Sequence, residues 1–186
     1  MTARRISLVL GTALVAGLSF SAIAQNGAAH DSGDRMTHSM QSDGSPDAMF
    51  MRKAAAANMA EIQAGRIALE KSGNAQVRQL AQRIIDDHTK AGDQLMSIAQ
   101  RKQVTLPTAP MPMQKQEAEH LNTLSGASFD QAYAQAMVKD HRKAIKLFGM
   151  ESASGSDPDL KQFASTTLPA LKQHLQMAEQ IAGRAH

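Results

Sequence analysis

The chain has 186 residues, with 20 basic and 17 acidic side chains and no cysteine, and this length indicates a single domain. Without cysteine the protein cannot form disulfides, thiolate metal sites or a catalytic thiol, and it cannot carry a lipid on an N-terminal cysteine. Aromatic residues make up 3% of the chain and no basic patch is interleaved with them, which excludes nucleic-acid binding.

Residues 1–24 have the organisation of a secretory signal peptide. Arg4 and Arg5 supply the basic start, residues 6–20 are apolar and uncharged, and Ala22-Ile23-Ala24 is a small-x-small cleavage site. The apolar stretch is shorter than the roughly 20 residues that a membrane-spanning helix needs. We therefore expect cleavage near Ala24 and a periplasmic or secreted protein without a transmembrane segment. The mature chain keeps 18 basic and 17 acidic residues, a net charge of +1.

Small and polar residues without periodicity fill residues 25–44. Such a segment cannot bury enough apolar surface to offset its chain entropy, so we expect a disordered arm. From residue 45 the composition changes to Ala, Leu, Met, Gln and Lys, which favour helix. Residues 45–183 are therefore the expected folded domain.

Helical periodicity predicts four long helices in this domain, with one short helical segment in the connection between the second and third. The expected bounds in chain order are 46–71, 75–102, the short segment 114–124, 128–152 and 158–181. Pro107, Pro110 and Pro112 predict a non-helical stretch before the short segment. Long helices of roughly 25 residues extend about 38 Å each, a length typical of a four-helix bundle.

Turn and cap residues set the limits of these helices. Ser45-Pro46 and Asp157-Pro158 each place a capping residue before a proline in the first turn. Gly73 suits a left-handed cap between the first two helices, and Ser128 followed by Gln131 predicts a capping box. Pro169 lies inside the last helix, where it removes one backbone hydrogen bond and predicts a kink.

An internal repeat carries two of the histidines. Residues 81–91 read AQRIIDDHTKA and residues 134–144 read AQAMVKDHRKA, with six of the eleven positions identical. Both copies hold Asp-His at the same place, as Asp87-His88 and Asp140-His141. The repeat is either a chance similarity between two alanine-rich helices or a shared constraint, and identity at Asp, His and Lys favours the constraint.

Steps of three and four residues place one ionisable side chain on the apolar face of each long helix. These side chains are Glu61, His88, His141 and His174 in chain order. Each lies near the middle of its helix, so at 1.5 Å per residue their depths agree to within roughly 9 Å. Four polar groups are therefore expected to meet at one level of an otherwise apolar core.

Buried ionisable groups are costly unless they are paired or bound to a metal. Imidazole nitrogens and a carboxylate oxygen suit zinc, iron, manganese or copper, and one of these is the expected ion if the cluster binds metal. Asp87 and Asp140 are expected either to support histidines of neighbouring helices or to be surface charges. This hypothesis describes an exported bundle that acts in metal handling or envelope stress.

The alternative is a hydrogen-bonded or pH-sensitive network of the same four side chains, in a non-catalytic envelope protein that interacts with a partner the sequence does not name. An enzyme is a weaker third hypothesis. No nucleophile–base motif, phosphate-binding glycine loop or paired-carboxylate motif occurs in the chain.

Three segments carry a family resemblance: IIDDHTKA, FDQAYAQAMVKDH and TLPALKQHLQMA. With the joint spacing of their histidines, they resemble an exported bacterial family called domain of unknown function 4142, over about residues 47–182. The resemblance implies a ferritin-like four-helix bundle and an exported location, and it supplies no activity.

The chain departs from one ferritin-like feature. Ferritin-like di-iron proteins carry Glu-x-x-His on two helices. The residues three positions before the three core histidines are instead Ile85, Val138 and Leu171. This difference argues against a di-iron oxidase and favours a mononuclear site, a weak site or none.

Overall fold

The computed structural model describes residues 44–183, and within this range the protein is all-α. The described part contains five helices and no strand. They are α2 (Pro46–Lys71), α3 (Ala75–Arg101), α4 (Pro112–Thr123), α5 (Gly126–Ser154) and α6 (Pro158–Ala182). The predicted all-α class is confirmed, as are the four long helices and the short helix between the second and third of them.

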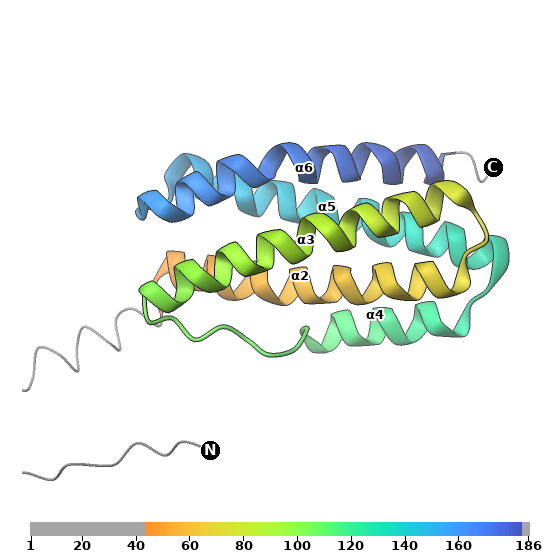
Figure 1. Cartoon of the computed structure of the whole chain (residues 1–186), viewed down its shortest axis with the longest axis horizontal. Coiled ribbons are helices and arrows are strands. Elements are labelled where there is room, and N and C mark those ends of the chain that lie inside the picture. Colours follow the sequence, from red (N-terminus) through yellow and green to blue (C-terminus); the bar gives the residue numbers. More distant parts are fainter. Residues whose placement is uncertain (1–43, 184–186) are drawn as a thin grey trace, which may run out of the picture. The chain divides into compact units, whose positions relative to one another are not determined.

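The four long helices lie side by side, and α4 flanks α2 (Figure 1). Short turns join α2 to α3 and α5 to α6 as antiparallel pairs, whereas a long connection that contains α4 leads from α3 to α5. This connection returns the chain to the end of the bundle at which α3 began, so α3 and α5 run in the same direction (Figure 1). Helices α2 and α6 each pack against both α3 and α5, and all of these neighbours are antiparallel.

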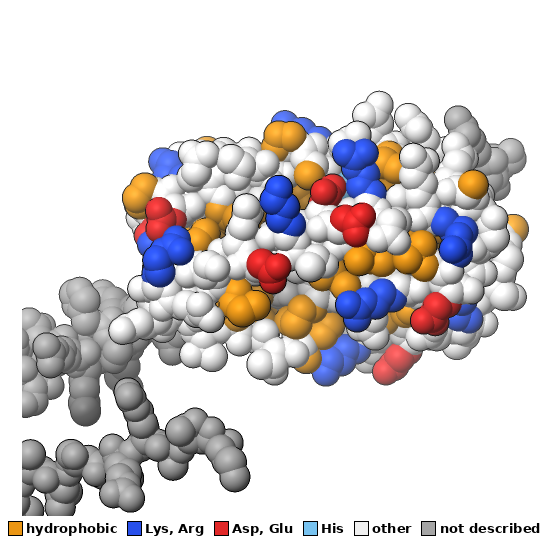
Figure 2. Space-filling model, viewed as in Figure 1, with side chains coloured by type: hydrophobic (Ala, Val, Ile, Leu, Met, Phe, Trp, Pro, Cys, Tyr) orange, Lys and Arg blue, Asp and Glu red, His pale blue; other side chains and the backbone are white. Residues whose placement is uncertain are grey.

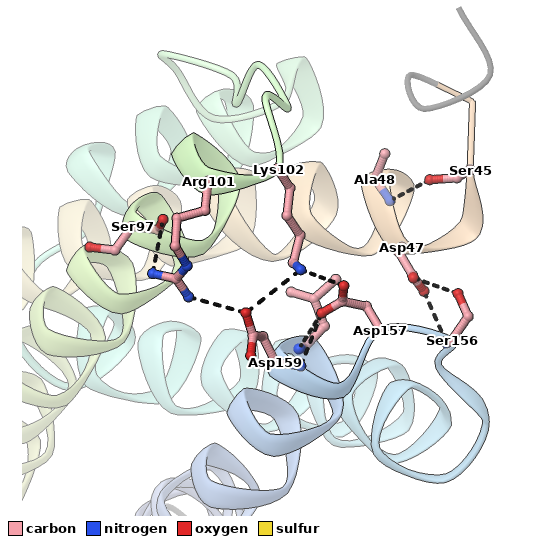
Figure 3. Close-up of polar contacts among 10 residues, drawn as sticks. Ser45, Asp47, Ala48, Ser97, Arg101, Lys102, Ser156, Asp157 and Asp159 are labelled. Carbon is pink, nitrogen blue, oxygen red and sulfur yellow. Dashed lines mark hydrogen bonds and ion pairs between the residues drawn. The ribbon is translucent and has the colours of Figure 1, made fainter. Parts of the chain in front are cut away.

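Caps and ion pairs define the end of the bundle at which α2 and α6 begin (Figure 3). Ser45 Oγ accepts a hydrogen bond from Ala48 N–H at 3.1 Å, and the Asp157 side chain accepts from backbone N–H groups in the first turn of α6. Lys102, which follows α3, forms an ion pair with Asp157. The residue that caps α6 therefore also links the two helix pairs.

The predicted start of the third long helix is wrong. Helix α5 begins at Gly126, so Ser128 lies within the helix and does not cap it. Gly126 has φ of 55°, a left-handed conformation that glycine adopts without steric cost, and this lets the chain enter the helix early. Phe129 and Tyr133, four residues apart in this helix, are both fully buried on one face of it.

Two predictions about glycine and proline are also wrong. Gly73 is not left-handed: Ser72, in an extended conformation, is the C-cap of α2, and Asn74 then caps the start of α3 with a side chain that accepts from two backbone N–H groups. Pro112 is the first residue of α4 rather than part of the non-helical stretch, since a proline loses no helical hydrogen bond at that position. Helix α6 continues through Pro169 as a single element, and the kink expected there stays a prediction.

The apolar core has two parts with a polar layer between them. Large side chains of the part near the α2–α3 turn include Leu80, Ile84, Phe129, Tyr133 and Met137. Those of the part near the α5–α6 turn include Phe50, Leu95, Phe148, Leu160 and Phe163. Along each long helix one buried ionisable residue, the subject of the next section, stands between the two parts.

The predicted signal peptide, residues 1–24, lies outside the described residues, as does the predicted disordered arm apart from Gly44. None of the helices between residues 44 and 183 combines the length and apolar character needed to cross a membrane. On the face shown in Figure 2, basic and acidic side chains are interspersed.

Candidate metal centre

Four ionisable side chains from four different helices meet in the polar layer. Glu61 comes from α2, His88 from α3, His141 from α5 and His174 from α6, and none of them is more than 7% exposed. One ring nitrogen from each of the three histidines lies within 4.8 Å of the others. The structure thus brings together all four residues that the sequence places on the inner helix faces.

A chain of contacts runs through two of the histidines. His141 Nδ1 lies 3.0 Å from the carbonyl oxygen of Met137, one turn earlier in α5. His141 Nε2 lies 3.2 Å from His174 Nδ1, and His174 Nε2 lies 2.9 Å from Asp87 Oδ2. A carbonyl or an ionised carboxylate can only accept, so His141 Nδ1–H and His174 Nε2–H are the donors. Met137 and Asp87 thereby determine which nitrogen of each ring is protonated.

The two inner nitrogens, His141 Nε2 and His174 Nδ1, then face each other. A neutral imidazole carries one N–H, so with the outer nitrogens protonated both inner nitrogens present lone pairs. Two lone pairs this close repel unless a proton or a metal ion lies between them. A proton would convert one of the rings to an imidazolium.

Burial opposes that extra proton. Desolvation lowers the pKa of His141 to about 4, with a further contribution from the neighbouring His174. Desolvation also lowers the pKa of His174, although its hydrogen bond to Asp87 acts in the opposite direction. At neutral pH both rings are therefore neutral, and no proton lies between their inner nitrogens.

Glu61 and His88 add two further donors without hydrogen-bond partners. Glu61 Oε2 lies 3.3 Å from His88 Nε2 and 3.5 Å from His141 Nε2. These are close approaches only, because within residues 44–183 neither Glu61 Oε2 nor His88 Nε2 forms a hydrogen bond. A buried polar atom without a partner costs about 1–3 kcal/mol.

The ionisation of these two groups reflects their burial. The pKa of the Glu61 carboxyl is raised to about 8. Desolvation is the largest cause, and the negative charges of Asp140 and Glu117 contribute to the same rise. Desolvation lowers the pKa of His88, assisted by His141 and His174. All three imidazoles are therefore neutral donors, the form that metal ions bind.

Three of the separations in the cluster match those between the ligands of a tetrahedral metal ion. A zinc ion with ligands about 2.0–2.1 Å away separates any two of them by about 3.3 Å. The corresponding atoms lie 3.2 Å apart for His141 and His174, 3.3 Å for Glu61 and His88, and 3.5 Å for Glu61 and His141. Three of the six ligand pairs already have this spacing, so the residues fit a bound transition metal.

The aspartates that precede the repeated histidines have different surroundings. Asp87 accepts from His174 and lies 3.6 Å from Arg83. Asp140 contacts Lys143 at 3.3 Å, and in the described part of the chain no hydrogen bond joins it to a histidine. The geometry for supporting a histidine is therefore present at Asp87 and not at Asp140, whose side chain faces α2 instead.

Two cavities adjoin the cluster. The larger, about 40 Å³, has Glu61, His88 and His174 on its wall, and its remaining lining is mostly apolar. A water molecule needs about 10–15 Å³ of such space, so a small ligand can lie beside the donors. The smaller cavity, about 10 Å³, lies under α4 and is also lined by Glu61. Glu61 therefore separates the two.

Sequence reasoning missed two contributors to this centre. The Met137 carbonyl is a backbone group, and the only signal for its role is its position four residues before His141. Glu117 influences Glu61 from α4, a helix outside the four-helix frame. The sequence contains only a weak sign that Glu117 faces the core: this residue precedes the buried Ala118 and lies four residues before the buried Leu121.

Residues 34–181 match the model of a family described as a domain of unknown function (DUF4142). The chain belongs to this family. The predicted family is therefore confirmed, over nearly the whole domain that contains the His/Glu cluster. No curated protein matches the sequence of this DUF4142 protein.

Two solved structures resemble the DUF4142 bundle. A crystal structure of a DUF305 fragment from Deinococcus radiodurans superposes with a TM-score of 0.66 and 17% identity, covering 75% of this chain and 96% of that chain. A structure of CopM in the Cu(I)-bound form gives a TM-score of 0.62 and 17% identity, covering 72% of this chain and 93% of that one. At such identity the likeness concerns the fold.

Proposed function

We propose that this protein is an exported helical bundle that binds one transition-metal ion through Glu61, His88, His141 and His174, and that it handles metal in the cell envelope. One observation carries the proposal. Lone pairs of neutral, buried imidazoles and an oxygen of the buried Glu61 carboxyl group converge at separations of 3.2–3.5 Å. Burial disfavours an extra proton on the imidazoles, and the one proton that the Glu61 carboxyl keeps at neutral pH can satisfy only one of the nitrogens, whereas a metal ion can bind all four groups.

The donor set favours a divalent ion. Three imidazoles and one carboxylate, without thiolate or thioether, suit zinc and copper(II) best, because sites of this kind bind Cu²⁺ and Zn²⁺ more tightly than iron(II) or manganese. The solved structure of CopM, described as Cu(I)-bound, supports the view that a bundle of this shape can hold a transition metal. Iron and manganese remain the weaker expectations for this centre.

Metal content tests the proposal directly. Residues 25–186, purified without chelator, are expected to contain one ion per chain by elemental analysis after exposure to zinc, iron and copper in turn. The His141→Ala variant should lose this ion because it lacks the central donor. His120→Ala is the matched control, since His120 is exposed on α4 and lies outside the cluster. Absence of stoichiometric metal, with an unchanged melting temperature in each metal, would remove the proposal.

The second candidate function is a non-catalytic interaction protein whose histidines form a structural network. It is favoured by the continuous chain of contacts from the Met137 carbonyl through His141 and His174 to Asp87. This row of contacts consists of three hydrogen bonds and has an acceptor at each end. The two histidine rings would therefore have to carry three protons between them. The lowered pKa values of both rings weigh against this arrangement at neutral pH.

Metal-free protein separates the two functions. If the network holds the fold together, His88→Leu and His174→Leu should each destabilise the chelator-treated protein strongly, because removing one member leaves the others unpaired. If the cluster is a metal centre, both variants should fold without metal and lose only the stabilisation that metal provides. Urea unfolding with and without zinc distinguishes these results.

Export is proposed on the basis of residues 1–24 alone, from their basic start, apolar stretch and small-x-small site. Expression of the full chain in a bacterium should yield a periplasmic protein whose first residue is Gln25. Mass spectrometry of periplasmic and cytoplasmic fractions checks this, and an uncleaved cytoplasmic product would contradict it.

A further inference from the structure

A row of carboxylates under α4 leads from the surface to Glu61. Glu61, Glu117 and Asp140 line the cavity of about 10 Å³ between α2, α4 and α5. Glu61 is 3% exposed and its Oε2 has no hydrogen-bond partner within the described chain. The Glu117 side chain is 26% exposed and the Asp140 side chain 22%. The three groups therefore connect solvent with the donor cluster.

The internal repeat explains why this side of the cluster is acidic. Helices α3 and α5 both pack on α2 and on α6, but the aspartates of the two copies face different neighbours. Asp87 of α3 meets a histidine of α6, which donates a hydrogen bond to it. At the corresponding place, Asp140 of α5 faces α2, where the buried group is a carboxylate, Glu61. Two carboxylates that share a cavity require a cation or a proton between them.

Lysines on α5 neutralise the outer carboxylates in the present arrangement. Lys139 Nζ lies 2.6 Å from Glu117 Oε1, and Lys143 Nζ lies 3.3 Å from Asp140 Oδ1. The two lysine side chains are 51% and 70% exposed, so each can turn into solvent and release its carboxylate. A divalent cation can then take the place of the ammonium groups.

We propose that transition-metal ions reach the cluster through this acidic passage, binding first to Glu117 and Asp140 and then to Glu61. The inference rests on the proposed metal-binding function and adds the path that the ion follows. Helix α4 buries only Ala118 and Leu121, so its local displacement opens the passage at lower cost than separation of two long helices.

The larger cavity on the other side of Glu61 is the competing path. Apart from the cluster, Asp87, Asn58 and Thr167, its lining is apolar, with Phe148 and Phe163 among the side chains. An apolar wall offers a hydrated cation little in exchange for its water ligands. A wall of carboxylates attracts the ion from solution and replaces those waters.

Uptake kinetics test the passage, with Co²⁺ as the probe because its visible absorption reports coordination. The double variant Glu117→Gln/Asp140→Asn should bind Co²⁺ about 10-fold more slowly than the parent chain, since a cleft of one charge sign speeds association by at least that factor. Its rate should also depend less on salt. Lys139→Ala should accelerate uptake, because it frees Glu117. Glu119→Gln, an exposed change on the same helix, is the control and should leave the rate unchanged.

The outcomes are distinct. Uptake by the folded double variant at the parent rate overturns the passage while leaving the metal centre intact. The same conclusion follows if Ala170→Leu, which fills the larger cavity, slows uptake and the double variant does not. Failure of the parent chain to bind Co²⁺, zinc or copper removes the proposed function and the passage together. Circular dichroism confirms folding, and Glu117→Gln alone, at a partly exposed position, tests the path if the double variant unfolds.

Discussion

Protonation determines what each side chain in the polar layer can do. Two acceptors outside the cluster, the Met137 carbonyl and the Asp87 carboxylate, hold protons on the outward nitrogens of His141 and His174. The inward nitrogens are left as lone pairs, and burial keeps the rings neutral. The donor character of the cluster therefore depends on residues that would never touch the metal.

Replacement of Asp87 by asparagine should weaken metal binding without unfolding the protein. The amide removes the negative charge that orients His174 and increases its basicity, and loss of such a partner typically costs 10–100-fold in affinity. Titration of zinc by calorimetry measures this. Asp86→Asn is the matched control, because the neighbouring Asp86 is exposed and contacts Gln82 rather than a histidine. Equal affinity of the two variants would contradict the role given to Asp87.

Glu151, near the end of α5, provides a pH prediction away from the cluster. The pKa of Glu151 is raised from 4.5 to about 7. Desolvation is the largest cause, the negative charges of Asp47 and Asp157 add to the rise, and the positive charge of Lys161 opposes it. The folded protein thus holds a proton there that the unfolded chain has released, so this group's contribution to stability falls as pH rises from 4.5 to 7.

Glu151→Gln should therefore be more stable than the parent chain at pH 8 and about equal to it at pH 4. Because solvent screens part of the effect, we expect a gain of about 1 kcal/mol rather than the full value implied by the shift. Urea unfolding at both pH values measures the difference between variant and parent, in which other titrating groups cancel. Glu70→Gln, at an exposed position on α2, should show no such pH-dependent gain.

At the scale of the helices, starting points are controlled by side chains that accept from the first backbone N–H groups. Ser45, Asn74 and Asp157 do this for α2, α3 and α6. Helix α5 lacks a side-chain cap hydrogen bond and instead begins at a left-handed glycine. Proline in the first turn accompanies a cap in α2 and α6, since it has no N–H to leave unsatisfied.

Asp157→Ala should destabilise the protein by about 1–2 kcal/mol, because it removes the cap of α6 and the ion pair with Lys102 that joins α6 to the end of α3. Chemical denaturation at neutral pH gives the value. Asp93→Ala, on the exposed face of α3, should change stability by no more than about 0.5 kcal/mol. Comparable effects of the two substitutions would show that the cap contributes little.

At the scale of the whole bundle, the polar layer divides the apolar core and receives one residue from every long helix. A metal ion bound there connects α2, α3, α5 and α6 at one point. Since unfolding separates the four ligands, the folded state binds the ion far more tightly than the unfolded chain, and binding free energy adds to the free energy of unfolding.

Zinc at 100 times its dissociation constant should therefore stabilise the protein by about 2.7 kcal/mol and raise the melting temperature by about 5–10 °C. Calorimetry of residues 25–186 measures the rise, and a chelator should reverse it. His141→Ala should melt at the same temperature with and without zinc, whereas His120→Ala should keep the full increase. A rise of equal size in His141→Ala would place the zinc elsewhere on the protein.

Local patterns determined much of this protein. Helical periodicity and caps are properties of short stretches of chain, so the four long helices, the turn at residues 72–74 and the cap at Asp157 follow from the amino-acid order. The same periodicity placed Glu61, His88, His141 and His174 on inner faces at similar depths, because rise per residue and helix length are constant. The start of α5 escaped this reasoning because the helix begins at a left-handed glycine, Gly126, rather than at the local capping pattern of Ser128.

Only the tertiary structure decided how the repeated Asp-His pairs differ. Asp87 and Asp140 occupy equivalent places in two similar segments, and nothing local distinguishes them. Their surroundings differ because Asp87 faces α6, which offers a histidine, whereas Asp140 faces α2, which offers a carboxylate. The contribution of Glu117 likewise depends on where the long connection places α4. Contacts between distant segments depend on packing, which sequence periodicity does not encode.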